Sequence, residues 1–121
     1  MFTLLLMIFC HIIDDYKLQS PVLANLKQKK YWQENVPDNL YKYDYIMALI
    51  MHSLSWSFMI MLPIAITMNF DINIGFLLTF ILNAIVHGII DDAKANRRKI
   101  NLITDQCIHL VQIGITALVL L

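Results

Sequence analysis

The chain has 121 residues, 59% of them hydrophobic and 15% charged, and its mean hydropathy is +0.62. Its formal net charge is +0, and its three glycines and three prolines are too few for a disordered or loop-rich chain. The composition therefore predicts an all-α integral membrane protein, folded as one domain over 1–121 in contact with a lipid bilayer. We expect no nucleic-acid partner, and two cysteines provide no disulfide framework.

Four apolar segments predict four transmembrane helices in a compact bundle, with bounds at about 1–16, 45–68, 72–92 and 101–121. The first is short, because a crossing usually takes ~20 residues. It lacks the basic start of a signal peptide, so we expect it to be a retained helix. Only a short turn at 69–71 separates the second and third helices, which predicts an antiparallel hairpin.

The connection between the first two helices mixes apolar and basic residues at helical spacing. Leu23, Leu26, Lys27, Lys30 and Tyr31 carry this pattern. It is typical of a helix that lies on the membrane surface, so we expect an interfacial segment there.

The basic residues predict the orientation of the bundle. Every Lys and Arg falls within 17–42 or 94–99, and four crossings bring both stretches to the same side. The positive-inside rule makes that side cytoplasmic, with the interfacial segment on it and both termini outside.

Three pairs of potential metal ligands are spaced four residues apart, and a further histidine lies in the second helix. Residues four apart in an α-helix project from one face. Ionisable residues at membrane depth are costly, which makes them candidates for function. The predicted metal ligands are His11, Asp15, His52, His87, Asp91, Asp105 and His109.

The predicted topology places all seven side chains in one layer near the cytoplasmic face. Three carboxylates and four imidazoles suit two divalent ions, which share a bridging group when they lie ~3.5–4 Å apart. Mixed nitrogen and oxygen ligands without thiolate favour Zn, Mn or Fe. The carboxylates of Asp15, Asp91 and Asp105 are the candidate catalytic groups. Asp14 lies three residues from His11, so the choice between Asp14 and Asp15 stays open.

Polar residues near these ligands are candidates for orienting them or for binding substrate. They are Gln19, Asn83, Lys94, Arg97 and Gln106. Lys94 and Arg97 are most economically explained as topology determinants, since both belong to a basic stretch; the alternative is that they bind a substrate phosphate.

The ordered His–Asp blocks carry a family resemblance. The runs His11-Ile-Ile-Asp-Asp15, His87-Gly-Ile-Ile-Asp91 and Asp105-Gln-Cys-Ile-His109, with His52 between the first two, span nearly the whole chain. They resemble a family of small bacterial and phage membrane proteins known only as a domain of unknown function. That family is similar in turn to LexA-regulated, membrane-bound metal-dependent hydrolases. The resemblance implies metal-dependent hydrolysis and a location in a bacterial inner membrane, and it suggests a phage or prophage source.

Three functions follow as hypotheses. The first is a two-metal hydrolase of a phosphoester or related bond, in a lipid or small molecule at the cytoplasmic leaflet. The alternative is a metal-stabilised interaction protein, such as a phage factor that blocks a host membrane or defence component. A metal-ion transporter is disfavoured, because the far half of the bundle offers no second ring of ligands. Four short helices bury little surface, so we expect a homo-oligomer.

Overall fold

The computed structural model describes all 121 residues, as helices and connecting loops without a strand. The all-helical prediction is therefore confirmed, and the four long segments lie close to their predicted bounds. The elements are α1 (Phe2–Ile13), the π-helix η1 (Asp14–Leu18), α2 (Pro21–Leu26), α3 (Lys29–Asn35), the 3₁₀-helix η2 (Asn39–Tyr41), α4 (Asp44–Thr67), α5 (Ile74–Ala95) and α6 (Leu102–Leu120).

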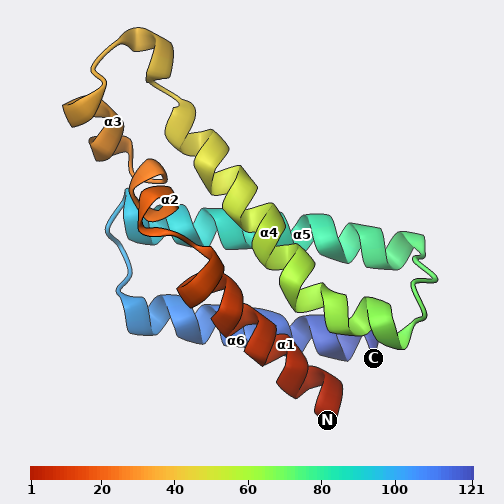
Figure 1. Cartoon of the computed structure of the whole chain (residues 1–121). Helices are drawn as coiled ribbons and strands as arrows, with labels where there is room; N and C mark the ends of the chain where they lie inside the picture. The colour runs from red at the N-terminus through yellow and green to blue at the C-terminus, as the bar shows by residue number, and fades with distance from the viewer.

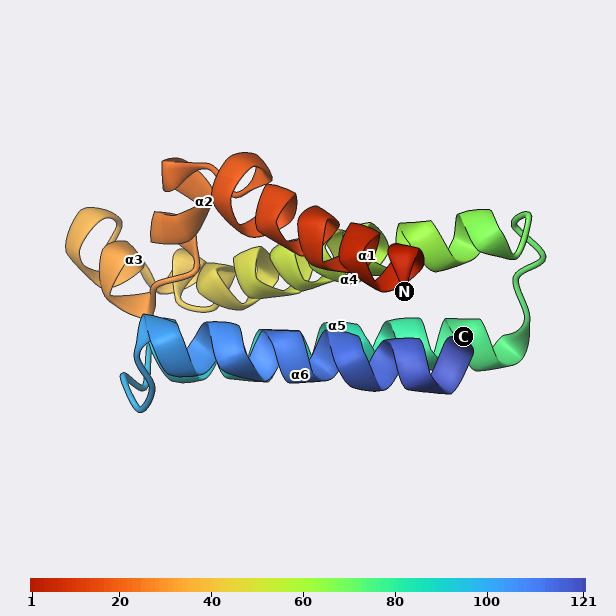
Figure 2. The same ribbon diagram turned by 90° about the horizontal axis from the view of Figure 1, so that it is seen from below.

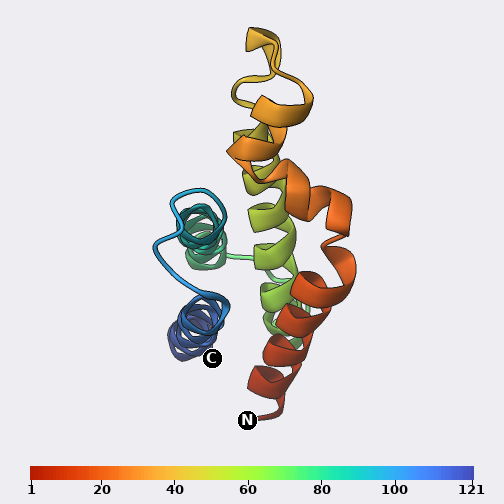
Figure 3. The ribbon, with the colours of Figure 1, turned by 90° about the vertical axis from the view of Figure 1, so that its left-hand side faces the viewer.

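The helices form two layers. Helices α1 and α4 make one layer, and the antiparallel pair α5 and α6 makes the other (Figure 2). Figure 1 shows α4 running obliquely across α5, and in Figure 3 the α5–α6 pair is seen nearly end-on beside α1 and α4. Residues buried between the layers are therefore in reach of all four helices.

Three helices are long and apolar enough to cross a membrane: α4 with the turn before it, α5 and α6. Large apolar side chains such as Phe58, Leu78 and Val111 are exposed on them, as lipid-facing residues are. These features indicate a membrane protein, as predicted. Helix α1 has 12 residues, which at 1.5 Å each span only ~18 Å of a ~30 Å hydrocarbon core. The predicted fourth crossing is therefore not confirmed.

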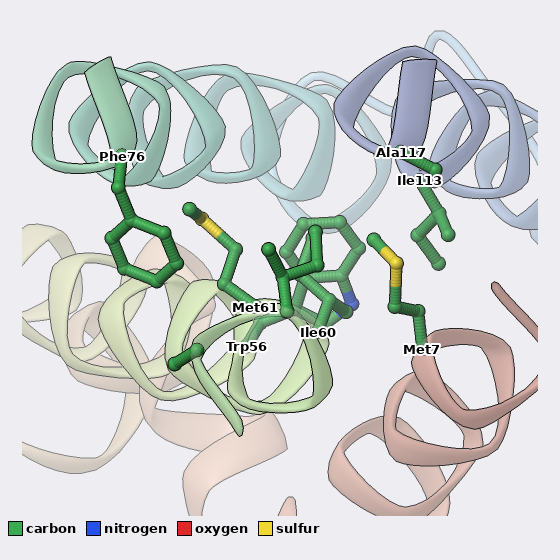
Figure 4. Close-up of a cluster of buried hydrophobic side chains, with 9 residues drawn as sticks. Met7, Trp56, Ile60, Met61, Phe76, Ile113 and Ala117 are labelled. Carbon is green, nitrogen blue, oxygen red and sulfur yellow. The ribbon is translucent and has the colours of Figure 1, made fainter. Parts of the chain in front are cut away.

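A cluster of buried apolar side chains joins the two layers (Figure 4). Trp56, Ile60 and Met61 project from α4 and meet Met7 of α1 and Ile113 of α6. Helix α4 is the central element of the fold. Of the 18-residue apolar stretch that could cross a membrane, 56% is buried in α4, against 22% in α5 and 28% in α6.

Asparagine side chains begin the last two helices. Asn73 Oδ1 accepts a hydrogen bond from the Phe76 amide at 2.9 Å, and Asn101 Oδ1 accepts one from Thr104 at 2.9 Å. Each satisfies an amide that the first helical turn leaves without a partner. A tight turn precedes Asn73, with Asn69 at φ 52° and Phe70 at φ 60°, so the predicted short connection between α4 and α5 is present.

The basic stretches lie at one end of the molecule. Helices α2 and α3 and the 96–101 loop share that end, whereas the 68–73 turn and both termini lie toward the other (Figure 2). We call this the basic end of the molecule, since 17–42 and 94–99 hold every Lys and Arg.

Helix α1 continues into a π-turn at this basic end. The Gln19 amide donates to the Asp14 carbonyl at 2.8 Å, five residues back. A π-turn holds more residues than an α-turn and is often found at functional sites. Here Asp14 is 1% exposed and the Asp15 side chain 10% exposed, so consecutive carboxylates both face inward.

Replacing Gly88 with alanine is expected to weaken the packing of α5 on α4. A Cβ at this position would lie 2.9 Å from Ser53 Oγ, so either Ser53 must rotate and lose its hydrogen bond to the Leu49 carbonyl or the helices must move apart. We expect the free energy of unfolding to fall by about 1–3 kcal/mol, measured by thermal or denaturant unfolding in detergent.

Ser53→Ala in the same chain removes the obstructing oxygen and leaves Ser53 Cβ 3.8 Å away. The double variant should therefore recover most of the lost stability. Gly114→Ala is the matched control, because nothing lies within 4 Å of its added Cβ. Equal losses at positions 88 and 114 would contradict this account of the helix contact.

Candidate metal centre

Four histidines, one from each long helix, meet between the two layers. They are His11 of α1, His52 of α4, His87 of α5 and His109 of α6, and each is at most 2% exposed. The ring centroids of His87 and His109 are 4.2 Å apart, and those of His52 and His87 are 5.1 Å apart. Each ring lies on the inward face of its helix, as the spacing of the polar residues predicted.

Carboxylates link these rings into one cluster. Asp15 Oδ1 and Asp91 Oδ2 each lie 3.5 Å from His52 Nε2. Asp91 Oδ1 lies 3.6 Å from His109 Nε2, and Asp105 Oδ1 lies 3.3 Å from the same nitrogen. Together with the 3.6 Å approach of His11 Nδ1 to Asp15 Oδ2, these contacts bring all seven predicted ligands into one cluster.

Two groups within the cluster have the geometry for a metal ion. Asp15, His52 and His87 form one group, and His87, Asp91 and His109 form the other, with ligand atoms within 4.8 Å of one another. Asp91 turns one oxygen toward His52 and His87 and the other toward His109. A carboxylate in that position is suited to bridge two ions.

Several ligand atoms are buried without a hydrogen-bond partner. They include both ring nitrogens of His87 and of His109, His52 Nε2, Asp15 Oδ1 and Asp105 Oδ1. An unpaired buried polar atom costs about 1–3 kcal/mol, and a cation would satisfy several of these atoms at once. The donor set of imidazole nitrogens and carboxylate oxygens therefore fits a divalent metal.

His11 differs from the other three histidines. Trp56 Nε1 donates to its Nδ1 at 2.8 Å, and its Nε2 lies 3.0 Å from Gln106 Oε1. Both ring nitrogens are thus already hydrogen-bonded to the protein. The role of His11 as a metal ligand stays a prediction.

Two lysines reach the carboxylates of the cluster. Lys94 Nζ lies 2.6 Å from Asp105 Oδ2, and Lys27 Nζ lies 2.5 Å from Asp91 Oδ2. The sequence pattern had indicated a surface helix around Lys27, but this residue is only 4% exposed. It lies between α2 and α3, where the chain folds back over the cluster.

The other predicted neighbours divide into two kinds. Gln106 Nε2 donates to Asp15 Oδ2 and Asp105 Oδ2, both at 3.1 Å, so it contacts the ligands directly. Gln19 Oε1 accepts from Lys27 at 2.7 Å. Asn83 instead bonds to other residues of the helix interior.

Gln19 therefore reaches the ligands only through Lys27, and Asn83 and Arg97 bond to residues outside the cluster. Asn83 donates to Thr116 at 2.9 Å and accepts from Gln112 at 2.8 Å, which forms a separate polar contact between α5 and α6. Arg97 pairs with Asp92 at 3.0 Å and its side chain is 60% exposed. Because α5 ends at Ala95, Arg97 leaves the helical face that carries His87 and Asp91.

The sequence interpretation missed Ser55 and Trp56, which lie beside the cluster, and left open the choice between Asp14 and Asp15. Asp14 places Oδ2 3.6 Å from His52 Nδ1 and accepts a hydrogen bond from Ser55 at 2.6 Å. Trp56 stacks on His87 with centroids 4.2 Å apart. A signal was present for Trp56, since it follows His52 by four residues on one helical face.

The fold and this cluster define a class: an all-helical membrane protein whose long helices enclose a buried His–Asp centre suited to divalent metal. The family model described as "Protein of unknown function (DUF3307)" matches residues 1–121, and the chain belongs to this family. No curated protein and no solved structure matches the chain.

Purified protein is expected to carry about two divalent ions per chain, measured by elemental mass spectrometry. His87 belongs to both ligand groups, so His87→Ala should lose most of the bound metal, whereas Asp105→Ala should lose less. Metal loss should also lower the melting temperature in detergent, because an ion that binds only the folded state stabilises it.

Asp71→Asn, on the exposed turn between α4 and α5, is the control and should keep both ions. His11→Ala decides the role of His11: loss of an ion would make it a ligand, and full retention would limit it to hydrogen bonding. Wild-type protein whose melting temperature does not respond to a chelator would contradict the metal centre.

Proposed function

We propose that this protein is a membrane-embedded, two-metal hydrolase that acts on a phosphoester or related bond of a lipid or small molecule at the cytoplasmic leaflet. The observation that carries the proposal is the buried cluster in which two groups of potential ligands share His87, and Asp91 turns one oxygen toward His52 and the other toward His109. Its sequence blocks resemble a family that is similar in turn to LexA-regulated, membrane-bound metal-dependent hydrolases, and this resemblance supports the same reaction class.

Each residue has a defined place in this proposal. Asp15 and His52 would hold one ion, and Asp105 and His109 the other. His87, which belongs to both ligand groups, and Asp91 would lie between the two ions. Two such ions generate a nucleophile from water and stabilise the oxyanion that develops during attack. The chain holds the carboxylates in position: Gln106 bonds Asp15 and Asp105 from one side chain.

The exposure of the cluster favours one direction of approach. The side chains of Lys94 and Asp15 are 30% and 10% exposed. The side chains of the other six predicted ligands are at most 3% exposed. Lys94 and Asp15 lie where α5 and η1 approach the basic end of the molecule. We infer that substrate enters from this end.

We also propose the four-crossing topology, with the basic end in the cytoplasm and both termini outside. Helix α1 and η1 together form a continuous helical segment over 2–18, which at ~1.5 Å per residue covers ~25 Å. A locally thinned bilayer accommodates a segment of this length. The positive-inside rule gives the orientation in a bacterial inner membrane.

Single cysteines test the topology in a chain with Cys10 and Cys107 replaced by serine. Cysteines at Asn35 and Lys99 should react with a membrane-impermeant reagent applied from the cytoplasmic side. A cysteine at Asp71 should react from the opposite side. Labelling of Asn35 and Lys99 from different sides would overturn the four-crossing arrangement.

A second candidate function is a metal-stabilised interaction protein, such as a phage factor that blocks a host membrane or defence component. One observation favours this function: each long helix contributes one histidine to the cluster. Bound metal would therefore hold the four helices together. A homo-oligomer would fit either function.

Asp15→Asn separates these two functions. Under the hydrolase proposal the variant should keep its metal but lose at least about 100-fold in turnover, because ligand charge sets the acidity of water at a metal centre. The assay is a screen of phospholipids, polyprenyl phosphates and nucleotides with wild-type protein, repeated on the variant. Asp71→Asn is the matched control and should retain full turnover.

The interaction function makes the opposite prediction. A variant that retains its metal should then retain the full biological phenotype, and wild-type protein should turn over no substrate. That pair of results would refute the hydrolase.

A further inference from the structure

Two ammonium groups lie against the carboxylates at the centre of the cluster. Lys27 Nζ contacts Asp91 Oδ2, and Lys94 Nζ contacts Asp105 Oδ2. The other oxygens of these two carboxylates approach the same atom, His109 Nε2, at 3.6 and 3.3 Å. The lysines therefore flank one position in the site, although they come from segments far apart in the sequence.

The backbone around Lys27 is fixed by a single side chain. Asn96 Nδ2 donates to the Lys27 carbonyl at 3.0 Å, and Asn96 Oδ1 accepts from the Lys29 amide at 2.7 Å. Asn96 in turn bonds Asp92 Oδ1 at 2.8 Å, which ties it to α5. Lys27 is thus held in the site by contacts on both sides of it, unlike a surface lysine that samples many positions.

No other basic residue reaches the cluster. Arg97 pairs with Asp92, and Lys30 approaches Glu34 with its side chain 63% exposed. Lys27 donates two of its three N–H groups to Asp91 and Gln19, and Lys94 donates one to Asp105. The remaining N–H groups are available to an oxyanion.

The charge of the cluster points to the same kind of ligand. The four inward-facing carboxylates are those of Asp14, Asp15, Asp91 and Asp105. Lys27 and Lys94 offset two of their negative charges. Two divalent ions would then leave an excess of two positive charges, and a phosphate dianion neutralises that excess.

We propose that Lys27 and Lys94 together bind the phosphate group of the substrate, so that the substrate class is a phosphorylated molecule. This inference rests on the proposed two-metal centre. The buried ammonium of Lys27 and the partly exposed one of Lys94 would hold phosphate oxygens beside Asp91 and Asp105, with Asn96 as a positioning residue for Lys27.

Phosphate binding by the zinc-loaded protein in detergent tests the proposal, with inorganic phosphate as the probe and calorimetry as the readout. Lys27→Gln and Lys94→Gln should each weaken binding about tenfold or more, as expected for loss of a charge-assisted hydrogen bond. Lys27→Arg should retain part of the affinity. The controls Lys30→Gln and Lys99→Gln should bind phosphate as wild type does.

Zinc content is measured for every variant by elemental mass spectrometry. Lysine variants that keep zinc and wild-type affinity for phosphate would overturn the proposal. So would loss of zinc in both variants, because the lysines would then serve only to hold the carboxylates, and so would wild-type protein that binds no phosphate.

Asn96→Ala provides a variant that alters neither lysine nor any proposed ligand. It should weaken phosphate binding with zinc retained, and unchanged affinity would contradict the positioning role. Lysine-dependent phosphate binding without turnover of any phosphorylated compound would refute the hydrolase and leave this inference standing.

Discussion

Burial of charge between two layers of apolar helices is the constraint on which this structure depends. The cluster takes His11, His52, His87 and His109 from four different helices and places all of them almost out of solvent. In such surroundings a charged group separated from its partner costs several kcal/mol. Displacing α5 would separate Asp91 from His52, His109 and Lys27 together, so the polar contacts fix how the helices are placed.

Apolar side chains pack against the cluster and hold its histidines in place. Trp56 is fully buried, stacks on His87 and donates its indole N–H to His11. It also belongs to the apolar cluster with Ile60 and Ile113. The indole of Trp56 therefore donates its N–H to the polar centre and packs its ring against both His87 and the apolar core. A tryptophan side chain suits this position because it combines a large apolar ring with one polar group. The histidines are held by packing as well as by charge.

Regular helical spacing explains what the sequence predicted. His87 and Asp91, and Asp105 and His109, lie four residues apart within single α-helices, so their shared faces follow from geometry alone. The prediction that these side chains meet rested on the topology, which places all seven at one depth in the membrane. Lys27 could not be placed in this way, because it lies outside the long helices and reaches Asp91 across 64 residues of sequence. Arg97 was a candidate because of its charge and not because of helical spacing; it lies beyond the end of α5 and pairs with Asp92.

The π-turn at Asp14–Leu18 has a consequence for how this site tolerates change. His52 lies between two consecutive carboxylates, with Nδ1 3.6 Å from Asp14 and Nε2 3.5 Å from Asp15. An unbroken α-helix separates neighbouring residues by about 100° around its axis, so it would turn one of the two away from the ring. The arrangement depends on backbone length as much as on side-chain identity. Deleting one residue from this turn would dismantle the pair even if both aspartates were kept.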